Sequence, residues 1–272
     1  MQKIKNVIRT FFYFFGIGLI KNDFGRHQKL IYKKFPHALN LNLGSGSFSH
    51  PNWKNVDMPN NFYSTFQNKI DIEHDFTSKK ELPFKNETVD NVYTSHVIEH
   101  IDDTSVDLLF SDVYRILNKG GSFRITCPDM NLVYKAYQRD DDFFWGEISP
   151  WKTNPSTKEE RLLEFFATSL SESISYGENK LSSEDVFSLY QDNSMEFFFE
   201  LIVNKLDKND KKYIEGHRNW FTKEKISTML KHAGFESIEV SAYLQSSSPL
   251  MRDSIIFDNT SPQYSLYIEC HK

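Results

Sequence analysis

Short apolar runs separated by polar segments recur along the first half of the chain. They predict β-strands over residues 39–43, 55–58, 70–73, 89–94 and 122–127. Before the last of these, apolar residues from Val106 to Leu117 repeat at helical spacing, and Thr104 with Asp107 fits a capping box. The pair Gly120-Gly121 is expected to end that helix. Strands that alternate with helical or loop connections predict an α/β fold with a doubly wound, mostly parallel sheet.

The pattern changes after Tyr137 and returns near Asn219. Residues 138–212 are acidic and aromatic with little strand signal, so we predict a helical insertion that acts as an acceptor lid. Thr222 then caps a predicted helix that Gly234 ends. Strands are predicted over residues 237–243, with one buried face formed by Ile238, Val240 and Ala242, and over residues 265–270. The expected domains are an N-terminal arm (1–35), a main domain (36–137 and 213–272) and the insertion (138–212).

Charge is unevenly distributed along the 272 residues, whose net charge is −5. Residues 1–35 hold eight Lys or Arg and one Asp, so the rest of the chain is acidic. A mainly acidic protein with one basic end is a poor nucleic-acid binder, and no nucleic-acid partner is expected. The two cysteines, Cys127 and Cys270, lie in apolar runs and form no metal-ligand or disulfide pattern, so we predict buried core residues in a reducing compartment.

The N-terminal arm contains an uncharged stretch, residues 11–20, flanked by Lys and Arg. It is shorter than the roughly 20 apolar residues that span a bilayer, and no small-residue cleavage site follows it. Two interpretations stay open: a helix lying on an anionic membrane surface, or a helix packed on the main domain. The expected location is the cytoplasm, with peripheral contact at the inner face of the membrane under the first interpretation.

Candidate chemistry gathers where the predicted strands end, which is where ligands bind in parallel sheets. Gly44-Ser45-Gly46 follows the first strand and allows backbone amides to approach a ligand. Asp57 ends the second strand and suits two ribose hydroxyls, but it follows Gly46 by only eleven residues, too few for the crossover helix of an NAD-binding fold. The segment 95–100, Ser-His-Val-Ile-Glu-His, follows the fourth strand. For the segment Gly44-Ser45-Gly46 the alternative is a plain turn at the end of a strand, and for Asp57 the alternative is a solvent-exposed side chain without a ligand.

Together these motifs resemble class I S-adenosylmethionine (SAM)-dependent methyltransferases, in particular the methyltransferase-11-like group associated with surface glycan biosynthesis. The matching segments are 42–46, 53–57, Asp75, 82–84, 89–93, 95–100, 114–117, 120–121, 127–129, 216–218, 233–235 and 265–269. The resemblance implies a Rossmann-like sheet of seven strands with an antiparallel last strand, and SAM as cofactor. The expected acceptor is a sugar hydroxyl in glycan biosynthesis, with a lipid or quinone-like hydroxyl as the alternative.

The resemblance also implies a set of cofactor-binding residues. They are Asn42, Gly44, Ser45, Gly46, Asp57, Met58, Asp75, Phe76, Ser95 and His96. The glycines would contact the methionine end of SAM, Asp57 the ribose, and Asp75 with Phe76 the adenine. Asn42 departs from the family, because many members carry an acid there; its amide oxygen can still accept a hydrogen bond from the amino group of SAM.

A methyl transfer from a sulfonium needs alignment and often a base that takes the proton of the acceptor, but no metal. The candidate bases are His96, His100, Asp129 and His217, with His96 and His100 preferred; a structural hydrogen-bonding role is open for each.

Three other classes of protein stay open. His96, Glu99 and His100 also fit H-x-x-E-H, a zinc-protease motif, although the glycine loop would then be unexplained. A non-catalytic module could keep the SAM fold. An NAD-dependent oxidoreductase is disfavoured because Ser49 stands where the third glycine belongs.

Overall fold

The structure is a computed structural model that describes residues 30–59, 69–150, 157–207 and 216–272. The chain forms two compact units, residues 1–36 and 37–272, and the account below concerns the second. The predictions for residues 11–20 lie outside the described residues. Within the described residues, none of the helices has the length and apolar character needed to cross a membrane.

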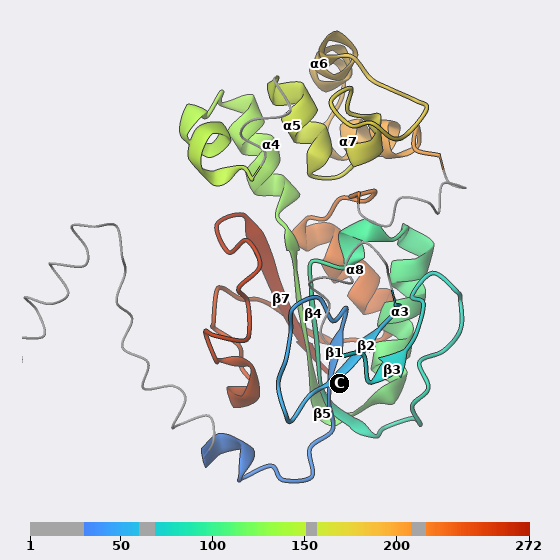
Figure 1. Cartoon of the computed structure of the whole chain (residues 1–272), viewed down its shortest axis with the longest axis vertical. Coiled ribbons are helices and arrows are strands. Elements are labelled where there is room, and N and C mark those ends of the chain that lie inside the picture. The colour runs from blue at the N-terminus through green and yellow to red at the C-terminus, as the bar shows by residue number, and fades with distance from the viewer. Residues whose placement is uncertain (1–29, 60–68, 151–156, 208–215) are drawn as a thin grey trace, which may run out of the picture. The chain divides into compact units, whose positions relative to one another are not determined.

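A seven-stranded sheet forms the centre of the second unit, in the order β3-β2-β1-β4-β5-β7-β6 (Figure 1). Its strands are β1 (Asn40–Leu43), β2 (Lys54–Asp57), β3 (Ile72–Glu73), β4 (Val89–Ser95), β5 (Leu117–Pro128), β6 (Ser237–Val240) and β7 (Ser265–His271). Strand β7 is antiparallel to both β5 and β6, and the remaining pairs are parallel. The predicted Rossmann-like methyltransferase fold, with its antiparallel last strand, is confirmed.

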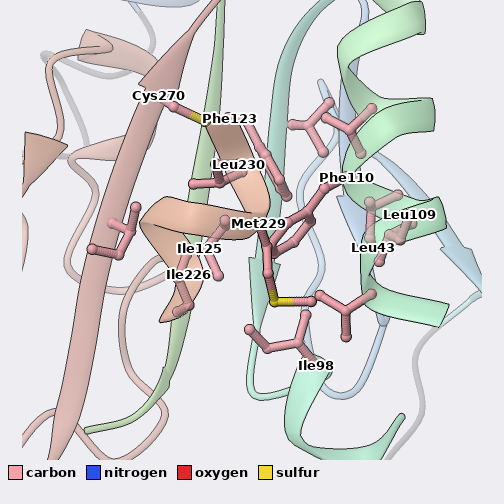
Figure 2. Close-up of a cluster of buried hydrophobic side chains, with 14 of the residues drawn as sticks. Leu43, Ile98, Leu109, Phe110, Phe123, Ile125, Ile226, Met229, Leu230 and Cys270 are labelled. Carbon is pink, nitrogen blue, oxygen red and sulfur yellow. The ribbon is translucent and has the colours of Figure 1, made fainter. Parts of the chain in front are cut away.

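One face of the sheet is covered by helices. The α-helices among the described residues of this unit are α3 (Asp103–Ile116), α4 (Met130–Gln138), α5 (Lys158–Glu164), α6 (Ser183–Asp192), α7 (Met195–Val203) and α8 (Lys223–Ala233). Helices α3 and α8 pack side by side against the central strands, and Figure 2 shows Phe110 of α3, Phe123 of β5 and Leu230 of α8 in the core between them. This core excludes water from the strands whose ends carry the candidate site.

A second hydrophobic core lies among the helices of the 130–207 region. It is dominated by rings, including Phe144, Trp145, Phe165, Phe166, Phe198 and Phe199. Aromatic side chains bury large areas, so these short helices can be stabilised by packing rather than by length. Apart from the isolated bridge between Ser171 and Leu181, the described part of residues 138–207 contains helices and turns.

Two predicted boundaries around α3 are wrong. The helix is capped by Asp102, whose Oδ1 accepts a hydrogen bond from the Ser105 backbone N–H at 2.8 Å, and not by Thr104. The following strand begins at Leu117 rather than at Ser122, because Leu117 already pairs with Val89 before the register shifts. The Gly120-Gly121 pair therefore lies within the irregular first part of β5.

The strand predicted over residues 237–243 ends at Val240, and its predicted buried face is wrong. Val240 is 59% exposed and Ile238 is only partly buried. The reason is that β6 is the edge strand of the sheet, paired on one side only. Both cysteines are buried and unpaired, as predicted.

Candidate active site

A cavity of about 700 Å³ opens at the carboxyl ends of β1, β2 and β4. Its lining includes every residue predicted to bind the cofactor: Asn42, Gly44, Ser45, Gly46, Asp57, Met58, Asp75, Phe76, Ser95 and His96. His100 lines it as well. The volume lies within the range of pockets that enclose a small ligand, roughly 300–1,000 Å³.

The loop after β1 requires glycine at Gly44. Its φ is +83°, and a Cβ built there would lie 2.2 Å from Cγ2 of Val97. The Gly44 backbone N–H donates to the carbonyl of Val56 at 2.9 Å, which holds the turn against β2. The backbone of the loop can thus approach a ligand more closely than any other residue type would allow.

Asn42 lies below this loop, buried in β1. Its amide nitrogen donates to the Gly44 carbonyl and to Oδ1 of Asn55, both at 3.0 Å. Because these two bonds use both N–H groups, the amide oxygen is the atom oriented to accept. Within the described residues no donor to that oxygen is present, so it can accept a bond from a ligand.

Asp57 ties the glycine loop to the end of β2. Its Oδ2 accepts from the backbone N–H and from the hydroxyl of Ser45, both at 2.7 Å, and its Oδ1 accepts from the Met58 backbone N–H at 2.7 Å. A carboxylate has about four lone-pair sites. A ribose hydroxyl would therefore share Oδ1 or displace the Ser45 hydroxyl.

Asp75 shapes the next wall of the cavity through a tight turn. Its Oδ1 accepts from the backbone N–H and the hydroxyl of Thr77, at 2.8 and 2.7 Å. The other oxygen, Oδ2, has no donor among the described residues, and the neighbouring residue Phe76 also lines the cavity.

His96 follows β4 in a left-handed conformation, with φ at +52°. Its Nδ1 lies 2.9 Å from Oε1 of Glu99, and its Nε2 makes a hydrogen bond of 2.8 Å with the Ser265 hydroxyl. Non-glycine residues at positive φ cost about 1–3 kcal/mol and are held in place by their surroundings. Here Glu99 and Ser265 fix the ring at the cavity wall.

Glu99 is the centre of a cluster of three histidines. The Nε2 of His217 lies 4.0 Å from Glu99 Oε1, and the rings of His100 and His217 meet edge to face with centroids 4.8 Å apart. Burial would raise the pKa of Glu99, but the attraction of His96, His100 and His217 outweighs it and lowers the pKa to about 2. Burial, reinforced by His100, lowers the pKa of His217 to about 3.

Residues 52–125, which run from the turn before β2 into β5, match the family model described as "Methyltransferase domain". This match includes the ends of β2 and β4 that form the cavity, within a seven-stranded sheet whose last strand is antiparallel, as the resemblance implied. Residues 52–125 belong to a methyltransferase domain.

Solved structures of methyltransferases align with most of this chain at low sequence identity. A SAM-dependent methyltransferase from Thermotoga maritima is 15% identical, with 90% of this chain and 87% of that chain covered and a TM-score of 0.42. One from Archaeoglobus fulgidus is 12% identical, covering 91% and 94%, with a TM-score of 0.41. One from Mesorhizobium loti is 13% identical, covering 90% and 96%, with a TM-score of 0.40. No curated protein sequence matches the chain.

Two candidate bases of the methyltransferase do not line the cavity. Asp129 caps α4, accepting from the backbone N–H groups of Asn131 and Leu132 at 3.0 and 3.3 Å, and burial raises its pKa. His217 lies behind His100 and bonds through Nδ1 to the Phe165 carbonyl at 3.0 Å. The structure thus brings His96 and His100 to the cavity of the methyltransferase and leaves Asp129 and His217 outside its lining.

Other residues that line the cavity had no role assigned from the sequence. They are Ser47, Phe48, Ser49, Thr77, Tyr93, Val97, Ile101, Arg218, Ile255, Ile256, Asn259 and Thr260. The stretch 255–260 has neither strand nor helix periodicity, and it reaches the methyltransferase cavity through tertiary packing only. Arg218 lies in a segment that resembles the family, which was the one available signal for it.

Proposed function

We propose that this methyltransferase transfers the methyl group of SAM to a sugar hydroxyl, on a glycan or a nucleotide-sugar. The observation that carries the proposal is the shared cavity, in which the residues expected to hold the cofactor stand beside His96 and His100. Alignment of two reactants within one cavity can contribute on the order of 7–11 kcal/mol to lowering a barrier.

The cofactor end fits SAM through backbone and acceptor groups. Gly44 and Gly46 would allow close approach of the methionine end, and the amide oxygen of Asn42 would accept from its amino group. Asp57 and Asp75 offer carboxylate oxygens for the ribose and the adenine amino group. When bound, SAM supplies a methyl group that its sulfonium has already activated.

The acceptor end fits a compound rich in hydroxyl groups. Arg218, Asn259 and Thr260 line the cavity with donors and acceptors that a sugar would use. His96 and His100 are the candidate bases for the hydroxyl proton, a role worth typically ~10²–10⁴-fold in rate. The helical insertion, residues 138–212, is proposed to cover the acceptor, and the arm, residues 1–35, to contact a membrane if the acceptor is lipid-linked.

The direct test is to incubate the full-length protein with SAM and separate panels of nucleotide-sugars, oligosaccharides, lipids and quinone-like phenols. We expect S-adenosylhomocysteine to form with a sugar compound, and mass spectrometry to detect one added methyl group on its oxygen. Turnover confined to a lipid or phenol would overturn the sugar assignment. SAM binding in calorimetry without turnover in any panel would indicate a binding module.

The glycine loop allows a second test of the cofactor end. Gly44→Ala places a methyl group against Val97, so we expect the affinity for SAM to fall at least about tenfold, equal to 1.4 kcal/mol. Gly120→Ala is the matched control, because Gly120 also has a positive φ of +79°, but a Cβ there would meet no atom within 4 Å and the residue has no place in the cavity. Equal losses of SAM affinity in both variants would contradict the proposed cradle.

A further inference from the structure

We propose that Glu99, His100 and His217 form a binding site for one divalent transition-metal ion at the acceptor end of the cavity. One potential ligand atom from each residue lies within 4.8 Å of the other two. The set differs from the one that the H-x-x-E-H pattern suggests, in which His96 and His100 would be the histidine pair. In the structure His96 contacts Glu99 through Nδ1 and is bonded to Ser265 through Nε2.

Both histidines are oriented in the manner of metal ligands. His100 Nδ1 bonds to the Gly216 carbonyl at 3.2 Å, and His217 Nδ1 bonds to the Phe165 carbonyl at 3.0 Å. When Nδ1–H donates to a carbonyl, the ring is fixed and Nε2 becomes the nitrogen with a lone pair. His217 Nε2 lies 4.0 Å from Glu99 Oε1, so a small inward shift would bring the two to the separation of shared ligands.

Glu99 supplies the carboxylate. Its side chain is 1% exposed, and although His96 Nδ1 lies 2.9 Å away, neither carboxylate oxygen accepts a well-formed hydrogen bond from the described residues. A buried carboxylate without such bonds is costly unless positive charge compensates it, and the neighbouring histidines or a bound cation can supply that charge. The arrangement is fixed by the main chain, because the Glu99 carbonyl accepts from the backbone N–H groups of Arg218 and Asn219, at 2.8 and 3.1 Å.

Two imidazole nitrogens and one carboxylate oxygen are a donor set suited to Zn²⁺ and similar transition metals, whereas Mg²⁺ prefers oxygen ligands. Three protein ligands leave a coordination position open. His100 lines the cavity, whereas Glu99 and His217 do not, so the ion would lie next to the space for the acceptor on the His100 side. At that position the metal would bind the hydroxyl oxygen of the acceptor and lower the pKa of that hydroxyl. This role of the metal rests on the proposed function, whereas the existence of the metal site does not depend on it.

The experiment uses the full-length protein, stripped of metal with a chelator and titrated with Zn²⁺ in a calorimeter. We expect one equivalent to bind, no competition by Mg²⁺, and visible d–d absorption when Co²⁺ replaces Zn²⁺. Glu99→Gln and His217→Ala should each weaken Zn²⁺ binding at least about 10–100-fold. His232→Ala, a change of an exposed histidine on α8, should leave it unaffected. Circular dichroism checks that each variant is folded.

Absence of stoichiometric Zn²⁺ binding and of Co²⁺ absorption by the unchanged protein would overturn the site. So would binding that is lost in His96→Ala and kept in His217→Ala, because the ligands would then be the histidines of the sequence motif. Calorimetry with SAM and the acceptor assay are run in parallel. Full turnover by the metal-free protein overturns the role of the metal in the reaction, absence of Zn²⁺ binding overturns the metal site, and bound metal without turnover overturns the proposed function only.

Discussion

The structure contains two clusters of buried charge, one within the sheet and one beyond the end of β4, and they differ in how completely their polar atoms are satisfied. One is centred on Arg124 of β5, whose side chain is fully buried. The other is centred on Glu99, equally buried, at the cavity. Buried charges are normally paired and hydrogen-bonded, so an exception needs a reason.

The Arg124 cluster is closed. The guanidinium donates to both carboxylate oxygens of Asp258, at 3.0 and 2.6 Å, to Glu269 Oε2 at 3.1 Å, to the Ser241 hydroxyl at 3.0 Å and to the Ala242 carbonyl at 2.9 Å. These contacts hold residues 241–258 against the sheet. No donor of Arg124 remains for a ligand, so the cluster is structural.

The Glu99 cluster is open. Two of its histidines, His100 and His217, are oriented by backbone carbonyls, yet its carboxylate oxygens accept no well-formed hydrogen bond from the described residues. An enzyme keeps such a group where chemistry uses it. The comparison therefore predicts a structural role for the Arg124 cluster and a functional role for the Glu99 cluster.

The largest expected effect is on folding and concerns the closed cluster. Arg124→Met leaves Asp258 and Glu269 buried without their cation, and we expect the free energy of unfolding to fall by about 3–5 kcal/mol. Urea denaturation measures it. Arg252→Met is the control, because Arg252 lies in the same segment but is exposed, with bonds only to the carbonyls of Ser246 and Ser247. Similar losses in both variants would show that Arg124 is not the anchor of this segment.

The open cluster should respond in turnover instead. His96→Asn removes a candidate base at the cavity, and we expect kcat to fall at least about 10²-fold while the free energy of unfolding changes less than in Arg124→Met. The measurement is S-adenosylhomocysteine formation at saturating SAM, beside a urea curve. Unchanged turnover would exclude His96 as the base, and a stability loss as large as that of Arg124→Met would contradict the difference in role between the two clusters.

What the sequence could predict was local. The cofactor loop, Asp57 and the segment 95–100 each follow a strand directly, so strand prediction placed them together at one edge of the sheet. The proximity of Glu99 and His217 could not be predicted from the sequence. It depends on backbone hydrogen bonds between residues that are more than a hundred positions apart. Arg124 interrupts an apolar strand, but nothing local identifies Asp258 as its partner. The exposure of Val240 is a similar case. It results from the position of β6 at the edge of the sheet, which is known only from the strand order.

The effect that is smallest at neutral pH is the one on the pH dependence of stability. His217 has its pKa lowered to about 3, because burial and His100 outweigh the attraction of Glu99, whereas an unfolded histidine titrates near 6.5. Between about pH 6.5 and pH 3 the unfolded chain therefore binds the additional proton, and stability falls as the pH falls. Glu99, with its pKa lowered to about 2 from 4.5, acts in the same direction at lower pH.

His217→Leu should remove this contribution, so that its urea stability falls less steeply with acid, by up to about 1.4 kcal/mol per pH unit, than that of the unchanged protein. Arg124→Met should instead lower stability most at high pH, because Asp258 and Glu269 are then charged and lack their cation, and the loss should shrink with acid as these buried carboxylates take up protons. Urea curves at a series of pH values compare the three proteins. A His217→Leu curve parallel to that of the unchanged protein would mean that His217 is protonated in the folded state, and the open cluster would then carry its own positive charge beside Glu99.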